Sequence, residues 1–254
     1  MWRVFSASAT GKRNLDQGAP GQDASHCVVR DDVLVAIVCD GAGSVPEGRT
    51  GADFMSRTLA DQLSSTLHAE RSLPDALARS SAGLEATIRS AIESVRGRLA
   101  ELAASRSLTL HDFSCTLVGC VASASGGSLF HVGDGFAIQQ GATGDSVLSP
   151  PENGEFADET YFVTDENWRD HLRLTPLPPP EGGCVIGLMS DGTVPFAVNR
   201  ARSGFFRPFI DPIAAFLRET TAPNGNEALQ NLLESPRACE ISPDDKTLLL
   251  ALRL

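Results

Sequence analysis

The sequence lacks the features that mark membrane, zinc-binding and nucleic-acid-binding proteins. It has no signal peptide and no apolar run near the roughly 18 residues that a membrane-spanning helix needs. Its six cysteines are scattered and no two have C-x-x-C spacing, so neither a zinc site nor a redox motif is indicated. The net charge of -11 argues against binding to nucleic acid or to an anionic membrane surface. We therefore expect a protein of the reducing cytoplasm, with no nucleic-acid or membrane partner.

The composition is that of an ordinary globular protein. Of the 254 residues, 42% are hydrophobic and 21% are charged, so a sizeable core is expected. The chain contains no internal repeat and no low-complexity segment. We expect one α+β domain over residues 1–254, in which residues 141–182, rich in Gly, Pro, Asp and Glu, form a variable flap.

The stretch 33–43 organises the rest of the chain. Seven apolar residues run from Val33 to Cys39, which is typical of a strand buried on both faces. The run ends at Asp40, and an ionised carboxylate at the end of a buried strand is costly unless a cation meets it. The glycines that follow allow a ligand to approach the backbone closely. We interpret Asp40 as a ligand or catalytic carboxylate, the alternative being an ordinary strand-to-turn Asp-Gly.

Hydrophobic periodicity predicts the other elements. The acidic pair Asp31-Asp32 suits the tight turn of a hairpin that joins a strand at 26–29 to the strand at 33–39. Residues 10–24 are expected to form a loop. Further strands are predicted at 2–7, 113–122, 128–132, 135–140, 184–189 and 248–252. Those at 113–122, 128–132 and 135–140 are expected to be three antiparallel neighbours. Helices are predicted at 49–68, 74–102, 210–218 and 227–234.

One local design recurs along the chain: a carboxylate at a strand end, usually beside glycine. The instances are Asp40, Asp134, Asp191 and the pair Asp244-Asp245. Each alone is common turn chemistry, but together they predict strand ends that converge on one acidic pocket, which needs cations. Oxygen ligands without a Cys or His pattern favour Mg²⁺ or Mn²⁺. A pair of such ions suits phosphate-ester hydrolysis by a metal-activated hydroxide.

An aspartyl-phosphate mechanism is not supported. The stretch from Met189 to Val194 is superficially similar to the haloacid-dehalogenase nucleophile, in which two aspartates flank one residue before Gly-Thr. Met189 stands where the first aspartate is required, and Asp40 has Ala42 at the second position. Neither site therefore has the required pair.

The order of these motifs resembles the metal-dependent protein phosphatases of type 2C, and it spans nearly the whole chain. The matching segments, in the family's order, are Gln22-Asp23-Ala24, Val38-Cys39-Asp40-Gly41-Ala42-Gly43, Ser114-Cys115-Thr116, Val132-Gly133-Asp134-Gly135, Met189-Ser190-Asp191-Gly192 and Asp244-Asp245-Lys246-Thr247. The resemblance implies a four-layer α-β-β-α sandwich, with two antiparallel β-sheets face to face and helices outside each.

The resemblance also assigns roles to these residues. It makes Asp40 the carboxylate that bridges two metal ions and the Gly41 carbonyl a ligand of one of them, with Asp191 and Asp244 on the second ion. Asp134 lies where bacterial relatives often hold a third, weaker metal. Gln22 occupies the place of a glutamate that contacts metal-bound water in many relatives, and Asp23 would support the cluster by hydrogen bonding.

Three positions depart from the family pattern. Ala42 replaces a histidine proposed as general acid, so the leaving group must take its proton from water or depart as an alkoxide that the metals stabilise. Gly18 replaces the arginine that holds the substrate phosphate, and Lys12 or Arg13 would have to reach in from the loop. Phe136 with Gly135 stands where relatives commonly have Ser-Arg.

These observations favour a serine/threonine protein phosphatase. Its substrates would be phosphorylated proteins, and its partner an antagonistic protein kinase or that kinase's target, as the resemblance implies. A pseudophosphatase that serves as a binding or regulatory module is the alternative, supported by Ala42 and Gly18 and opposed by the retained aspartates. A phosphatase of small phosphoesters is a third hypothesis, which a substrate panel would distinguish from a protein phosphatase.

Overall fold

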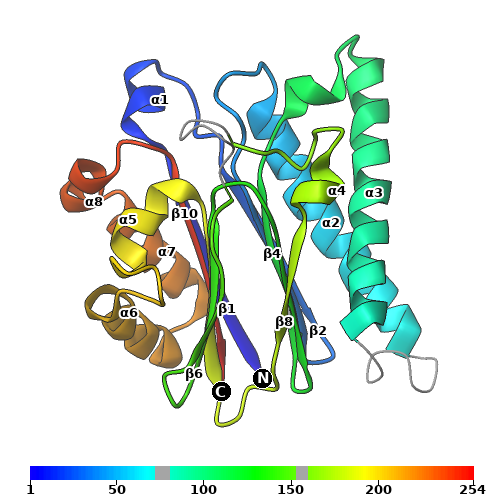
Figure 1. Ribbon diagram of the computed structural model, residues 1–254. Helices are drawn as coiled ribbons and strands as arrows, with labels where there is room; N and C mark the ends of the chain where they lie inside the picture. The colour runs from blue at the N-terminus through cyan, green and yellow to red at the C-terminus, as the bar shows by residue number, and fades with distance from the viewer. Residues whose placement is uncertain (72–80, 153–159) are drawn as a thin grey trace.

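Two five-stranded antiparallel sheets face each other between two layers of helices (Figure 1). The computed structural model describes residues 1–71, 81–152 and 160–254. One sheet has the strand order β1-β10-β9-β6-β7 and the other β2-β3-β4-β5-β8. The predicted α-β-β-α sandwich is thus confirmed. The strands are β1 (Trp2–Ala9), β2 (Ala24–Arg30), β3 (Val33–Cys39), β4 (Leu117–Ser123), β5 (Gly126–Val132), β6 (Phe136–Gly141), β7 (Ser146–Ser149), β8 (Arg173–Leu177), β9 (Cys184–Met189) and β10 (Lys246–Arg253).

The helices lie outside the two sheets. On one side α2 and α3 cover the sheet that contains β3, and on the other side α5, α6, α7 and α8 lie along the sheet that contains β10 (Figure 1). Their bounds are α1 (Lys12–Asp16), α2 (Gly48–Arg71), α3 (Ser81–Ser105), α4 (Trp168–His171), α5 (Val194–Ala197), α6 (Arg207–Glu219), α7 (Ala222–Leu233) and α8 (Pro236–Ile241), with short 3-10 turns η1 (Leu110–Phe113) and η2 (Asp191–Thr193).

Strand β3 is buried on both faces, as its apolar run predicts. Val35 and Ile37 belong to the apolar layer shared with α2 and α3. Leu34, Ala36 and Val38 belong instead to the layer between the two sheets. Because both faces are covered, every residue of the strand is apolar, without the alternation of polar residues found in strands that have one face in water.

The predicted β2–β3 hairpin is present. Arg30 pairs with Val33, and the two residues between them, Asp31 and Asp32, have φ angles of 50° and 61°. Two successive left-handed residues form the turn whose twist matches that of the flanking strands, and aspartate tolerates this conformation better than most residues.

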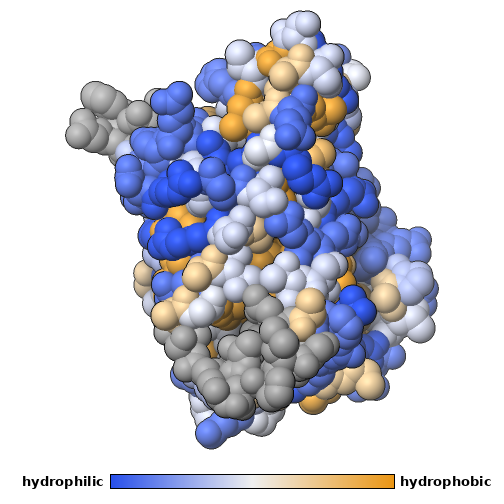
Figure 2. All heavy atoms as spheres, turned by 90° about the vertical axis from the view of Figure 1, so that its right-hand side faces the viewer, coloured by the Kyte–Doolittle hydropathy of each residue, from blue (hydrophilic) through white to orange (hydrophobic). Residues whose placement is uncertain are grey.

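The outer helices are amphipathic. Met55, Leu59 and Leu63 of α2 are buried against the sheet. The opposite face of the α2–α3 layer is mainly hydrophilic, with apolar atoms showing only in patches (Figure 2). The predicted beginning of the second helix near Pro74 lies outside the described residues. No helix in the described part of the chain combines the length and apolarity that crossing a bilayer would require.

Some predicted elements differ in detail. Residues 10–24, expected to be a loop, include the short helix α1, which buries no residue and is therefore weakly marked by apolar periodicity. The strand expected from Phe113 begins at Leu117, since the preceding residues form η1. Strand β6 is not a neighbour of β5 but pairs with β9 in the other sheet. Periodicity identifies a strand but not the sheet to which it belongs, and it did not indicate α8.

Candidate active site

Three of the predicted carboxylates meet in one cavity at an edge of the sandwich. Asp40 follows β3, Asp191 follows β9, and Asp244 lies two residues before β10. These three side chains line one cavity of about 230 Å³ together with Gly41 and Gln22. We call this space the acidic cavity.

Backbone contacts fix Asp40 and Gly41 at the end of β3. The Asp40 amide donates to Thr116 Oγ1 (3.0 Å), and the Thr116 amide donates to the Asp40 carbonyl (2.8 Å). Gly41 lies against the first turn of α2, where an added Cβ would stand 2.4 Å from the carbonyl carbon of Gly48. Only glycine fits this close approach of two backbones.

The carboxylates raise one another's pKa. Burial raises the pKa of Asp40 well above its ordinary value, and the charges of Asp23, Asp191 and Asp134 raise it further. The pKa of Asp191 rises to about 7, chiefly through burial and then through Asp134, Asp23 and Asp244. This electrostatic conflict is what a bound cation relieves.

Asp23 joins the ends of the two sheets. Ser190, after β9, donates its hydroxyl to Asp23 Oδ2, before β2, over 2.6 Å. The Ser190 hydroxyl is held in turn by the backbone amide of Thr247, 2.9 Å away. Burial raises the pKa of Asp23 to about 6, although these hydroxyl contacts oppose the rise. Its other oxygen, Oδ1, is buried and has no hydrogen-bond partner among the described residues.

Asp134 lies beside the acidic cavity rather than in its lining. Its Oδ2 accepts a hydrogen bond of 2.6 Å from Thr160 Oγ1, and its Oδ1 is buried without a partner in the described chain. Asp134 and Asp191 both line a neighbouring cavity of about 440 Å³. Asp191 therefore stands between the two cavities.

Gln22 contacts the backbone of the turn that follows Asp40. With its amide oriented by its hydrogen-bond partners, the side-chain nitrogen donates to the carbonyls of Gly41 (3.1 Å) and Ala42 (3.0 Å). A glutamate in this orientation would place a carboxylate oxygen against two carbonyl oxygens. The neutral amide thus suits the contacts of this loop.

Asp245, the second acid of the Asp244-Asp245 pair, has a separate role that the sequence did not indicate. Its carboxylate accepts hydrogen bonds from the amides of Gly11 (2.5 Å) and Gln22 (2.6 Å) and from Asn14 Nδ2 (2.9 Å). It therefore ties the loop around α1 to the beginning of β10. No motif signals this function, because the three donors lie more than 220 residues away in the sequence.

Only one of the two candidate phosphate-binding residues lines the acidic cavity. Arg13 lines the acidic cavity, whereas Lys12 is not part of the lining, and its backbone amide donates to the Pro243 carbonyl (2.7 Å). Gly18, which stands where relatives have arginine, has a φ angle of 64° and open space around it.

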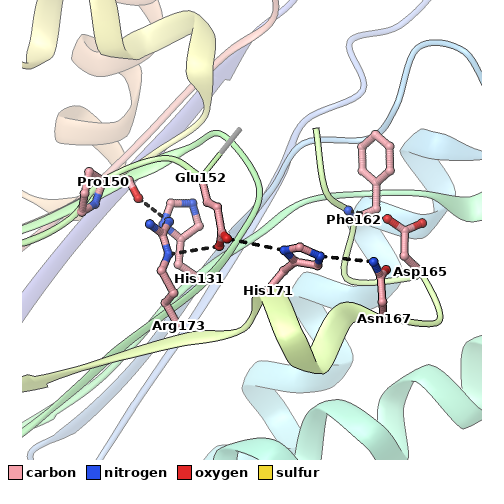
Figure 3. Close-up of polar contacts among 8 residues, drawn as sticks. All are labelled: His131, Pro150, Glu152, Phe162, Asp165, Asn167, His171 and Arg173. Carbon is pink, nitrogen blue, oxygen red and sulfur yellow. Dashed lines mark hydrogen bonds and ion pairs between the residues drawn. The ribbon is translucent and has the colours of Figure 1, made fainter. Parts of the chain in front are cut away.

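A polar network next to Asp134 was not predicted (Figure 3). Arg173, at the beginning of β8, donates to the Pro150 carbonyl and lies 3.6 Å from the Glu152 carboxylate. Glu152 also lies 3.5 Å from His171 Nδ1. The network joins the two ends of the segment between β7 and β8, and the Glu152 amide donates to the Gly133 carbonyl (3.0 Å) beside Asp134.

The residues of the acidic cavity suit a hard divalent cation. No three His, Cys, Asp or Glu side chains in the described ranges are grouped tightly enough to hold a metal ion by themselves. Mg²⁺ nevertheless retains several waters and is commonly held by one or two carboxylates. Such a hydrated ion suits the unpartnered carboxylate oxygens of Asp23 and Asp134. Its positive charge also suits the crowded carboxylates of Asp40 and Asp191, whose pKa values are raised.

Comparison with known proteins identifies the family. A family model described as Protein phosphatase 2C matches residues 10–234. Serine/threonine-protein phosphatase 3 of Escherichia coli (strain K12) is 30% identical over 263 residues, which cover 99% of this chain and 98% of that protein. The chain therefore belongs to the protein phosphatase 2C family, whose members are metal-dependent.

Solved structures share the fold at low sequence identity. The serine/threonine phosphatase Stp1 from Staphylococcus aureus has a TM-score of 0.62 at 18% identity, covering 100% of this chain and 96% of that one. RsbX, solved in complex with magnesium, has a TM-score of 0.57 at 13% identity, covering 99% of this chain and 94% of that one.

Proposed function

We propose that this protein is a Mg²⁺- or Mn²⁺-dependent phosphatase that hydrolyses phosphoserine and phosphothreonine in proteins. The observation that carries the proposal is the acidic cavity, in which carboxylates from both sheets raise one another's pKa. Family membership supports the reaction class. The whole chain, residues 1–254, would act as one catalytic domain in this reaction.

The proposed metal ligands are the groups that line or adjoin the acidic cavity. Asp40 and the Gly41 carbonyl would hold one of two ions, with Asp40 shared, and Asp191 and Asp244 would hold the second. Asp134, which has an unpartnered oxygen beside Asp191, would help to hold a third. When bound, such ions neutralise phosphoryl charge and lower the pKa of a water so that it attacks phosphorus at neutral pH.

The chain's own residues would orient the reactants. Arg13 is the one cationic side chain in the described lining of the acidic cavity, so we assign it, and not Lys12, to the substrate phosphate. Asp23, held by Ser190 across the two sheets, would fix the relative positions of the strand ends and accept a hydrogen bond at its free oxygen. Gln22 would hold the Gly41 carbonyl in place.

The leaving alcohol would take its proton from solvent. Ala42 stands in place of the family's histidine, and the described lining of the acidic cavity includes no histidine. The physiological substrate would be the product of an antagonistic protein kinase, since a phosphoprotein phosphatase needs a reaction that supplies its substrate.

The decisive test is metal-dependent hydrolysis by wild type and Asp191→Asn. p-Nitrophenyl phosphate and a phosphothreonine peptide would be tested with Mn²⁺, with Mg²⁺ and with excess chelator. We expect turnover that requires metal and falls at least about 100-fold in Asp191→Asn, since a ligand of the reacting centre is lost. Asp211→Asn, a change on the exposed part of α6, is the matched control and should keep wild-type activity. Absence of metal-dependent turnover in the wild type would contradict the proposal and favour a pseudophosphatase.

A further inference from the structure

The larger cavity beside the acidic cavity has no role in the mechanism above apart from the two aspartates that it shares with the proposed metal site. Its volume is about 440 Å³, and its lining includes the half-buried Asp191 and Asp134. Val194, Pro195 and Val198 line it as well. Because Asp191 belongs to both cavities, a phosphorylated side chain in the acidic cavity would place its neighbouring residues at this second space.

Two exposed arginines line this cavity. Arg200 and Arg202 belong to the loop 199–204, and both contribute to the lining. The loop is closed by an antiparallel bridge between Val198 and Phe205 and by a hydrogen bond of 3.0 Å from the Asn199 amide to the Gly204 carbonyl. We call it the arginine loop.

Internal hydrogen bonds give the arginine loop a defined shape. The Arg202 amide donates to the Asn199 carbonyl (2.8 Å), and Asn199 Oδ1 accepts from the Ser203 amide (3.1 Å). Arg202 itself has a φ angle of 51°. A non-glycine residue in this region is uncommon, and here it belongs to the turn that these hydrogen bonds close.

Neither arginine is neutralised within the described chain. Arg200 and Arg202 are exposed, and no described carboxylate lies within ion-pair distance of either. Some other arginines are paired, for example Arg207 with Asp211 at 2.9 Å and Arg253 with Asp32 at 2.6 Å. On a protein with a net charge of -11, two guanidinium groups on one cavity with no ion pair to a described carboxylate suit an anionic ligand.

We propose that the arginine loop is a specificity subsite that binds an acidic side chain next to the phosphorylated residue of the substrate. The inference rests on the proposed phosphatase function, which places the phosphate in the acidic cavity. Successive residues of an extended peptide are about 3.3 Å apart, so a glutamate one to three positions away lies within reach of a long arginine side chain. The substrate class is therefore phosphopeptides with acidic flanking residues.

The opposite preference is the main alternative. Asp134 and Asp191, which line the same cavity, would attract a basic flanking residue if their charge were not neutralised. In the proposed enzyme bound cations would offset these carboxylates, whereas no described carboxylate neutralises Arg200 or Arg202. The sign of the flanking-residue preference thus separates the two possibilities.

The experiment compares two phosphothreonine peptides that differ only by isosteric changes. One carries two Glu on each side of the phosphothreonine, and the other carries Gln at the same positions. We expect kcat/KM for the Glu peptide to be about tenfold higher with the metal-loaded wild type, which corresponds to about 1.4 kcal/mol. The ratio should fall to about one in Arg200→Ala/Arg202→Ala, and it should shrink as the salt concentration rises.

A matched control removes the same charge elsewhere. Arg30→Ala/Arg89→Ala takes away two exposed arginines, on β2 and α3, and should keep the tenfold ratio. A wild-type ratio near one, a preference for Gln or for basic flanks, or an unchanged ratio in the arginine-loop variant would each overturn the proposal.

Binding separates this proposal from the proposed function. Hydrolysis of p-nitrophenyl phosphate by the wild type reports on the phosphatase itself, without any flanking residue. If that activity is absent, fluorescence anisotropy with the same two labelled peptides still tests the subsite. Tighter binding of the Glu peptide that is lost in Arg200→Ala/Arg202→Ala supports the subsite, and equal binding of both peptides overturns it.

Discussion

His131 is a fully buried histidine whose contacts favour the neutral ring. Its Nδ1 lies 3.2 Å from the Ser149 hydroxyl and 3.3 Å from Arg173 Nη2, which can only donate. Figure 3 shows His131 beside Arg173. These partners assign the proton to Nε2, because Nδ1 must accept. Burial, and then the charge of Arg173, lower the pKa of His131 to about 3.

This shift predicts a loss of stability in mild acid. The unfolded chain binds a proton at His131 below a pH of about 6.5, whereas the folded chain binds it only near the lowered pKa. The contribution of the neutral His131 to the free energy of unfolding is therefore complete above a pH of about 6.5 and is lost as the pH falls. We expect a loss of about 2 kcal/mol by a pH of about 5. Urea unfolding between these pH values measures it, and His131→Asn should show a smaller loss over the same range. Parallel curves for the two proteins would contradict the assignment.

Gly192 allows the turn after β9 to lie against the beginning of β10. A Cβ added to Gly192 would stand 2.0 Å from the Asp245 carbonyl oxygen. Gly192→Ala should therefore push Asp191 away from Asp244, cost about 1–3 kcal/mol of stability and lower kcat/KM. Thermal unfolding and the p-nitrophenyl phosphate assay measure the two effects.

Gly97 provides the control for that change. It lies within α3, and a Cβ added there would meet nothing within 4 Å. Gly97→Ala should raise stability by about 0.5–1 kcal/mol and leave activity unchanged. If both alanine variants behaved alike, close packing at Gly192 would not be the cause.

At the scale of elements, α1 and its flanking loops depend on one carboxylate. Asp245 accepts three hydrogen bonds from this segment, and the segment carries Arg13 and Gln22 into the acidic cavity. Asp245→Asn loses the charge and at least one acceptor position, so we expect about 1.5–3 kcal/mol of destabilisation. The KM for phosphopeptide should rise more than kcat falls, because Arg13 is less well placed.

Limited proteolysis distinguishes this effect from global unfolding. Cleavage near Lys12 and Arg13 by trypsin should be faster in Asp245→Asn than in wild type under native conditions. Asn14→Ala removes a single donor and should give a smaller change in the same direction. Equal cleavage rates in all three proteins would show that the segment is held by other contacts.

The sequence predicts a secondary-structure element most reliably where one physical effect dominates. Burial on both faces makes the run at 33–39 a strand regardless of its neighbours, and the structure confirms it. The short α1 has no buried side chain to reveal it, and the pairing of β6 with β9 depends on contacts between distant segments. Such pairings have no local signature in a single sequence.

For the site, the predicted Asp40, Asp191 and Asp244 do share one cavity, since each is tied to a strand end that periodicity locates. The roles of Asp245 and of the arginine loop were not foreseen. Asp245 appears as half of an acidic pair, and Arg200 and Arg202 appear as ordinary charged loop residues. Only the folded chain shows what these side chains contact and which cavity they line.

For the whole molecule, the buried acidic cluster predicts strong stabilisation by divalent cations. A ligand that binds only the folded state at about 100 times its Kd adds about 2.7 kcal/mol. For a chain of this size that corresponds to an increase of about 5–10 °C in Tm. Calorimetry with Mn²⁺, Mg²⁺ and chelator measures the shift, and Asp191→Asn should lose most of it. An equal shift in that variant would place the ion elsewhere.

The lengths of β1 and β10 also determine how far the two termini lie from the acidic cavity, and so where the protein can be immobilised without blocking that cavity. Trp2 pairs with Arg253 at one end of the ladder and Ala9 with Lys246 at the other, next to Asp244. The two termini thus lie together at the lower edge in Figure 1, about 25 Å from the carboxylates, given the rise of eight strand residues. Immobilisation on a sensor through either terminus would therefore turn the acidic cavity toward the solution.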